Sequence, residues 1–284
     1  MSLKKIALLS LGNCLLVACL AFSVSSRATQ GEGLTEVVIA GDNWCPINCG
    51  KDDPQQGYMI DVARLALKES GYTLKYVEIP WARAVSLARA GEIHGIVGAF
   101  RGDAPGFIFP NSPLLQMSSS NLYTRVESDW RFVGEPSLEA VRLGVIRDYD
   151  YGPLINTYVE TYGKNPNRVS IMSGDNAVER NIKQLLRGRL DAFVETAPVF
   201  WYAAKNLKVT QLLRDAGSAG EQEPCYIAFS PNRKDSLAIS KALDAGVLPM
   251  AKKGKLKLLG QAYGLPESVI PKLPVVQMNA VAQP

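Results

Sequence analysis

The chain has 284 residues, of which 47% are hydrophobic and 20% charged, a balance typical of globular proteins. A chain of this length can bury a full core without metals or several disulfides. Its formal charge of +4 falls to +1 when residues 1–28 are left out, because they hold Lys4, Lys5 and Arg27 and no acids. This weak charge argues against nucleic acid as a partner, and no motif indicates a cofactor.

Residues 1–28 have the features of a secretory signal peptide. Lys4 and Lys5 precede an almost wholly apolar run over residues 6–24, and small residues follow that run. We therefore predict a signal peptide over residues 1–28 and a periplasmic location for the mature chain. Two alternatives stay open: a transmembrane anchor, and a lipid anchor on Cys19, which follows a short stretch that looks like a bacterial lipobox.

Three cysteines follow this segment: Cys45, Cys49 and Cys225. In an oxidising compartment the closely spaced Cys45 and Cys49 predict a disulfide. The alternatives are a redox pair, which more usually has two intervening residues, or metal ligands, which would want more nearby His or Cys. Cys225 lies in an apolar run, which predicts a buried thiol.

The first part of the mature chain alternates between strand and helix patterns. Short apolar, β-branched runs predict strands, and apolar residues three or four apart that end at a glycine predict helices. This order is typical of an open, mainly parallel α/β sheet. The predicted strands are residues 37–40, 74–79 and 93–100, and the predicted helices are residues 60–70 and 81–90.

The same pattern then restarts, which predicts a second α/β unit in tandem with the first. Ligands of open α/β sheets sit at the carboxyl ends of the strands, so residues 42–49, 98–103, 147–151 and 195–196 are where a site is expected. The predicted strands are residues 141–146, 169–172, 190–194 and 225–229; the predicted helices are residues 151–162, 177–186, 197–205, 236–252 and 255–263.

Four sequence segments share a family pattern over residues 36–265. They read VVIAGDNWCP with GYMID, PWARA with GEIHGIVG, LGVI with LLRGRLDAFV, and YIAFS before the last helices. In order and spacing they resemble the family 3 extracellular solute-binding proteins of the polar amino-acid-binding type, as a divergent member. The resemblance implies the periplasmic binding protein-like type II fold, with two α/β lobes, mainly parallel sheets, a hinge and a ligand cleft. It implies lobe 1 over residues 30–122, lobe 2 over 124–223 and a return to lobe 1 over 225–265. Four prolines over residues 266–284 predict a loose tail.

The resemblance also implies ligand-binding residues in lobe 1. Trp44 and Trp81 stand where the family places aromatic side chains, although both could instead be core residues. Phe100 and Arg101 end the third predicted strand, near where the family grips a carboxylate with an arginine. The loop is two residues shorter here, and the arginine's place, counted back from Phe109, falls on Asp103. Arg101 is therefore expected to reach in from an earlier position or to be a solvated loop residue.

In lobe 2 the expected binding residues follow two strands. Tyr149, Asp150 and Tyr151 replace the family's usual loop of small residues, and Asp150 could meet a cation or cap the helix that follows. Thr196 stands where amino-acid binders carry an aspartate that pairs with the ligand's ammonium group. Glu195 could supply that charge, although strand alternation could turn it to the other face.

The sequence therefore predicts a monomeric, extracytoplasmic solute-binding protein of an ABC-type uptake system, not an enzyme. It would bind a small polar metabolite, an amino acid or a related compound, and deliver it to a membrane permease in another chain. The alternatives are a periplasmic dehydratase-type enzyme on the same fold, with Glu195 as general acid, and a sensory or accessory module. His94, the single histidine, is expected to be a surface turn residue.

Overall fold

The computed structural model describes residues 34–50 and 52–273. The predicted signal peptide, the possible lipid site at Cys19 and the tail beyond residue 273 lie outside these residues. Among the helices that are described, none is long and apolar enough to cross a bilayer.

Five strands form the first sheet, in the order β2-β1-β3-β10-β4. The central strand β3 pairs in parallel with β1, which pairs in parallel with β2, whereas β10 runs antiparallel to both β3 and β4. The strands are β1 (Thr35–Gly41), β2 (Tyr72–Glu78), β3 (Gly95–Ala99), β4 (Leu115–Met117) and β10 (Glu223–Phe229).

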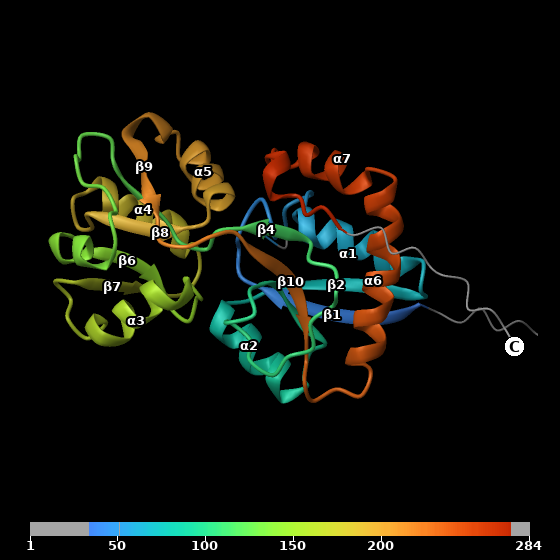
Figure 1. The fold of residues 1–284 in the computed structure, drawn as a ribbon. Helices are drawn as coiled ribbons and strands as arrows, with labels where there is room; N and C mark the ends of the chain where they lie inside the picture. The colour runs from blue at the N-terminus through green and yellow to red at the C-terminus, as the bar shows by residue number, and fades with distance from the viewer. Residues whose placement is uncertain (1–33, 51, 274–284) are drawn as a thin grey trace, which may run out of the picture. The chain divides into compact units, whose positions relative to one another are not determined.

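The helices associated with this sheet are α1 (Tyr58–Lys68), α2 (Trp81–Ala90), α6 (Ser236–Lys252) and α7 (Lys255–Ala262). Helix α1 buries Met59, Val62, Ala63 and Ala66, a spacing of three or four residues that places them on one side of the helix. Helices α1 and α6 pack together (Figure 1). A Cβ atom at Gly246 of α6 would lie 2.2 Å from the Ala66 carbonyl oxygen, so this close approach requires glycine.

The second sheet has the order β7-β6-β8-β5-β9. Strand β6 pairs in parallel with β7 and β8, and β5 runs antiparallel to β8 and β9. The strands are β5 (Asn121–Arg125), β6 (Leu143–Ile146), β7 (Val169–Met172), β8 (Ala192–Glu195) and β9 (Leu213–Ser218), and the helices are α3 (Gly152–Tyr162), α4 (Ala177–Leu186) and α5 (Ala197–Asn206). Three short 3-10 turns, η1 (Glu135–Ala140), η2 (Thr210–Leu212) and η3 (Glu267–Val269), complete the described elements.

The chain passes between the two sheets through residues 118–120 and 219–222. These two segments bind each other: the Ala219 N–H donates to the Ser120 carbonyl at 2.9 Å, and the hydroxyls of Ser118 and Ser218 lie 3.1 Å apart. The expected first crossing, near residue 123, falls inside β5, and the expected return near residue 225 falls inside β10.

The predicted α/β class is confirmed, but the sheets are mixed where mainly parallel sheets were expected. Each sheet has two parallel and two antiparallel strand pairings. The difference comes from β4, β5 and β9, which were not predicted as strands, and from β10, which crosses back into the first sheet. Strands β4 and β9 are edge strands of their sheets, and such strands carry weak apolar patterns.

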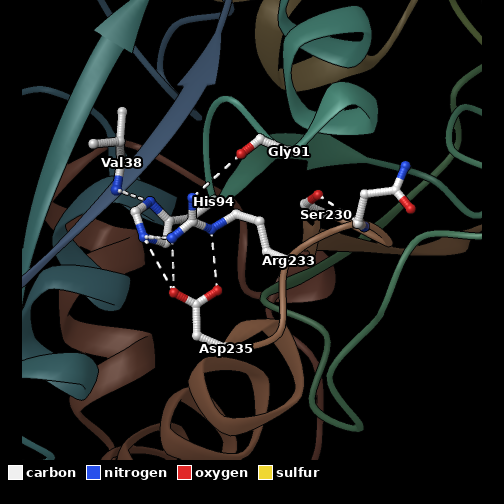
Figure 2. Close-up of polar contacts among 7 residues, drawn as sticks. Val38, Gly91, His94, Ser230, Arg233 and Asp235 are labelled. Carbon is white, nitrogen blue, oxygen red and sulfur yellow. Dashed lines mark hydrogen bonds and ion pairs between the residues drawn. The ribbon is translucent and has the colours of Figure 1, made fainter.

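His94 is largely buried, in contrast to the expected surface turn residue. Its Nδ1 atom accepts a hydrogen bond of 3.0 Å from the Val38 N–H of β1, and its side chain is 12% exposed. Figure 2 shows Arg233 and Asp235, which precede α6, closing over the other side of the ring. Burial, and then the neighbouring Arg233 guanidinium, lower the pKa of His94.

We expect His94→Ala to lower the free energy of unfolding by about 1–2 kcal/mol, because the Val38 N–H loses its acceptor. A histidine whose folded-state pKa is lowered adds stability at high pH that is lost as pH falls below its unfolded value of 6.5. Urea unfolding at pH 7.5 and 5.5 measures the free energy of unfolding of the native chain and of the variant. The native chain should be the more stable at pH 7.5, and the difference in free energy should be smaller at pH 5.5. An equal difference at both pH values would contradict the assigned role.

Candidate functional site

A small cavity lies where strands of both sheets end. Its volume is about 20 Å³, which is room for about one water molecule. The loops after β1, β3, β6 and β8 supply most of its walls, as expected for the carboxyl ends of strands in α/β folds. The lining residues are Asp42, Trp44, Trp81, Val97, Gly98, Phe100, Asp103, Ser119, Tyr149, Asp150, Tyr151, Glu195 and Thr196. We call this space the central cavity.

Eight of the nine residues predicted to bind a ligand line the central cavity, and Arg101 does not. Arg101 is exposed, and its guanidinium lies over the rings of Phe109 and Tyr226, 4.8 and 5.1 Å from their centroids. These rings attract the cation electrostatically, which holds it away from the cavity. Asp103 lines the cavity instead, at the position reached by counting back from Phe109.

Aromatic rings form most of the apolar wall. The Tyr149 ring stands edge-on to Trp44 and Trp81, with centroids 6.3 and 6.2 Å away, and it lies 6.0 Å from Tyr151. The Trp44 ring meets Phe100 in the same edge-on manner at 6.4 Å. Tyr149 also packs against all three hydrophobic clusters of the described chain, so its position connects the site with the cores.

Trp44 is held in place by a short disulfide-closed loop. Cys45 and Cys49 form the predicted disulfide, which uses both sulfur atoms and leaves neither free as a metal ligand in this state. Within the same loop the Trp44 N–H donates to the Asn48 carbonyl at 2.8 Å. The loop therefore presents the Trp44 indole to the cavity on a constrained backbone.

Glu195 faces the central cavity from the end of β8. Its side chain is 1% exposed, and its Oε1 atom accepts hydrogen bonds from the Trp44 indole N–H at 3.0 Å and the Thr196 N–H at 2.8 Å. Its Oε2 atom has no hydrogen-bond partner within the described residues. Burial raises the pKa of this carboxyl to about 8, so Glu195 keeps its proton at neutral pH.

Asp42, directly after β1, was not among the predicted binding residues, although residues 42–49 were expected to hold a site. The Tyr149 hydroxyl donates to its Oδ2 atom at 2.6 Å. Burial raises the pKa of Asp42 to about 6 and places that of Tyr149 well above its usual range. This bond and the bond between Trp44 and Glu195 each join loops that follow strands of different sheets.

Asp103 and Asp150 form a second polar contact between these loops. The Asp103 carboxylate accepts from the N–H groups of Phe100, at 2.7 Å, and Asp150, at 2.8 Å, and burial raises its pKa well above the usual range. Asp150 in turn accepts from the Gly152 N–H at the start of α3. Asp150 thus lines the cavity and also accepts a hydrogen bond at the start of α3, and its expected contact with a cation stays a prediction.

The indole of Trp81 makes a further contact between the same loops. Its N–H donates to the Asp148 carbonyl at 3.0 Å, so Trp81 at the start of α2 binds the loop that carries Tyr149. Gly102 lies so close to Asp150 that a Cβ atom there would overlap a carboxylate oxygen. Any larger residue at position 102 would therefore displace the Asp150 side chain.

We expect reduction of the Cys45–Cys49 disulfide to lower the free energy of unfolding by about 2 kcal/mol, from loop-closure entropy. Thermal melts with and without a reductant measure this loss, and Cys45→Ser serves as the variant that reductant should not affect further. Alkylation of the unreduced, denatured chain followed by peptide mass spectrometry should leave Cys45 and Cys49 unlabelled and label Cys225. Labelling of Cys45 would contradict the disulfide.

We expect Glu195→Gln to raise the melting temperature at pH 7.5. The raised pKa means that the unfolded chain loses this proton near pH 4.5 and the folded chain only near pH 8, so the native chain loses stability as pH rises between these values. Glutamine removes that loss, which is on the order of 1–4 kcal/mol at neutral pH. Thermal melts of the native chain and of Glu195→Gln should give the same melting temperature at pH 4, and a higher one for the variant at pH 7.5. Glu92→Gln, which changes an exposed acid, should show no such gain.

No family model matches this sequence, and no curated protein matches it. Solved structures with the same fold are numerous. A putative L-cystine ABC transporter from Listeria monocytogenes has a TM-score of 0.68 and 16% identity, over 84% of this chain and 100% of that chain. The structure reported for glutathione import through GshT and the cystine ABC importer TcyBC of Streptococcus mutans has a TM-score of 0.66 and 18% identity, over 84% of this chain and 97% of that chain.

A third neighbour is a histidine kinase sensor domain described as similar to periplasmic binding proteins. Its TM-score is 0.67 at 16% identity, over 85% of this chain and 99% of that chain. At these identities the likeness concerns the fold. Together with the two mixed α/β sheets and the two crossings between them, it shows that this chain has the fold of the type II periplasmic binding proteins.

Proposed function

We propose that this chain is an extracytoplasmic solute-binding protein of an ABC-type uptake system, and that its solute binds in the central cavity. One observation carries the proposal. Aromatic and acidic side chains from the loops after strands of both sheets meet at one cavity and bind one another across it. Convergent polar groups in an aromatic-walled pocket are what a small-solute site requires.

The two crossings between the sheets support a hinge. The two crossing segments, residues 118–120 and 219–222, are short and contain small residues such as Ser118, Ser120 and Gly220. The cavity admits about one water molecule, so any larger solute has to enter while the loops are apart. Closing the hinge would then exclude water and strengthen every charged contact with the solute.

The neighbours support the coarser statement of a small polar solute. Their descriptions mention cystine, glutathione and arginine, and ABC transporters. By analogy, the solute would pass to a membrane permease in a separate chain, and the mature protein would work in the periplasm as a monomer. The roles of Trp44, Trp81, Phe100, Tyr149, Asp150, Tyr151, Glu195 and Thr196 as ligand contacts belong to this proposal.

Glu195 supports a second candidate, a dehydratase-type enzyme. A carboxylic acid that stays protonated at neutral pH inside a water-poor cavity is suited to donate a proton to a leaving group. The substrates considered for such an enzyme, prephenate and arogenate, carry carboxylates. Among the described residues, no basic side chain lines the central cavity to bind a carboxylate, which argues against this candidate. The sensor-domain neighbour supports a third candidate, a module that reports its ligand to a membrane partner.

We expect a library of amino acids, amines, organic acids and small peptides to contain a class that raises the melting temperature. At one hundred times its Kd, such a compound stabilises the folded chain by about 2.7 kcal/mol, or roughly 5 °C or more. The same compound should change tryptophan fluorescence, and Trp44→Phe should weaken its binding about tenfold, because the bond to Glu195 is lost.

Trp130→Phe is the matched control, since the Trp130 indole binds the Ser137 carbonyl outside the central cavity. Equal loss of affinity in Trp44→Phe and Trp130→Phe would mean that the compound does not bind in the central cavity. A library without any binder would argue against a transport role. Loss of prephenate or arogenate in the presence of the native chain, and not of Glu195→Gln, would favour the enzyme instead.

A further inference from the structure

Every charged side chain that lines the central cavity is an acid. Asp42, Asp103, Asp150 and Glu195 line it, and no lysine, arginine or histidine from residues 34–50 and 52–273 does so. The nearby Arg101 lies over the rings of Phe109 and Tyr226 instead. A carboxylate on the ligand would therefore meet only negative charge or protonated acids, and would lack the cation that such a group needs when it is buried.

Two acceptor atoms in the cavity are unused. Glu195 Oε2 and Thr196 Oγ1 are both buried, and neither makes a hydrogen bond of normal geometry with a described residue, although the Thr196 side chain lies near enough to the Glu195 carboxyl to lower its pKa. Buried polar atoms of this kind are rare because leaving them unpaired is unfavourable. Glu195 lines the cavity with 1% of its surface exposed, so once the acid has lost its proton its free oxygen is in place to accept a hydrogen bond from a ligand. A donor on the ligand would relieve this cost.

The spacing of the carboxyl groups and the rings around them favour an organic cation over a metal ion as the ligand. No three of the four carboxyl groups bring oxygen atoms within 4.8 Å of one another, so they do not form a cage of the kind that holds calcium. The rings of Trp44, Trp81, Phe100, Tyr149 and Tyr151 line the same cavity as these carboxyl groups. Aromatic faces attract ammonium groups, and aromatic cages with few acids are a recurrent way of binding amines.

We propose that the ligand of the central cavity is a small organic ammonium compound without a carboxylate, such as a primary amine or diamine, with Glu195 and Asp42 as its charge partners. This inference rests on the proposed function and narrows it to one substrate class. An ammonium head has about the size of a water molecule, so it fits the space between these walls. The rest of the ligand would displace the Tyr149 ring from between Trp44 and Trp81.

The protonation of Glu195 and Asp42 gives this inference a distinctive signature. Glu195 and Asp42 have pKa values raised to about 8 and about 6, and binding a cation favours their charged forms. An ammonium ligand should therefore expel protons, and its affinity should rise with pH between about 6 and 8, by up to tenfold per unit for each proton released. The titratable groups that face these two carboxyls are Glu78, Asp103, Tyr76, Tyr123, Tyr149 and Tyr151, none of them basic.

The test compares 1,4-diaminobutane with 1,4-butanediol and succinate, which replace its two cations by neutral or anionic groups. Isothermal titration with the full chain at pH 6, 7 and 8, in phosphate, gives the affinities, and a pH-indicator dye in weakly buffered solution gives the protons released. We expect binding of the diamine alone, tightening with pH and releasing protons. Glu195→Gln should bind it at least tenfold more weakly, while Glu92→Gln, which removes an exposed charge, should bind as the native chain does.

The outcomes separate this inference from the proposed function. If arginine, other amino acids or succinate bind and simple amines do not, the ammonium inference fails and the solute-binding function stands. Binding of calcium in place of the diamine, or unchanged affinity in both Glu195→Gln and Asp42→Asn, would also overturn it. If no compound of any class binds, the proposed function fails as well. Melts of each variant without ligand show whether a lost affinity reflects lost folding.

Discussion

Burying several carboxyl groups in one aromatic cavity is the constraint on which the rest of the site depends. Removing a charged carboxylate from water costs far more than its hydrogen bonds return, so the group keeps its proton instead. Glu195 and Asp42 show this in their raised pKa values, and Glu195 retains a buried oxygen without a partner. Under the proposed function, these groups cost stability that a ligand of the right charge would restore, which is the usual relation between stability and function in binding sites.

Residues around the cavity also connect the two sheets to each other. Tyr149 with Asp42, Trp44 with Glu195, Trp81 with Asp148 and Asp150 with Asp103 each connect loops that follow strands of different sheets. Because these contacts use the side chains that line the cavity, a ligand must compete with them or add to them. Under the proposed function, binding and closure would be one process, and a change at any of these residues would affect both.

Much of the fold could be predicted from the sequence, because buried β-branched runs and helical spacing are local properties. The boundaries of α4 agree with its apolar spacing, and eight binding candidates line the cavity because loops after strands converge in this fold. Arg101 was misplaced for a physical reason that no pattern carries. The Phe100 N–H binds the Asp103 side chain, and the loop directs that acid inward while Arg101 lies over Phe109 and Tyr226. Strands β4 and β9 were missed because pairing partners far along the chain define them.

The disulfide in the loop after Trp44 makes completion of the site depend on the redox conditions around the chain. Reducing conditions keep Cys45 and Cys49 as thiols, and the loop that presents the indole to Glu195 then lacks its covalent brace. Under the proposed function, the pocket would be completed only in an oxidising compartment, so the chain would bind its solute fully only after export.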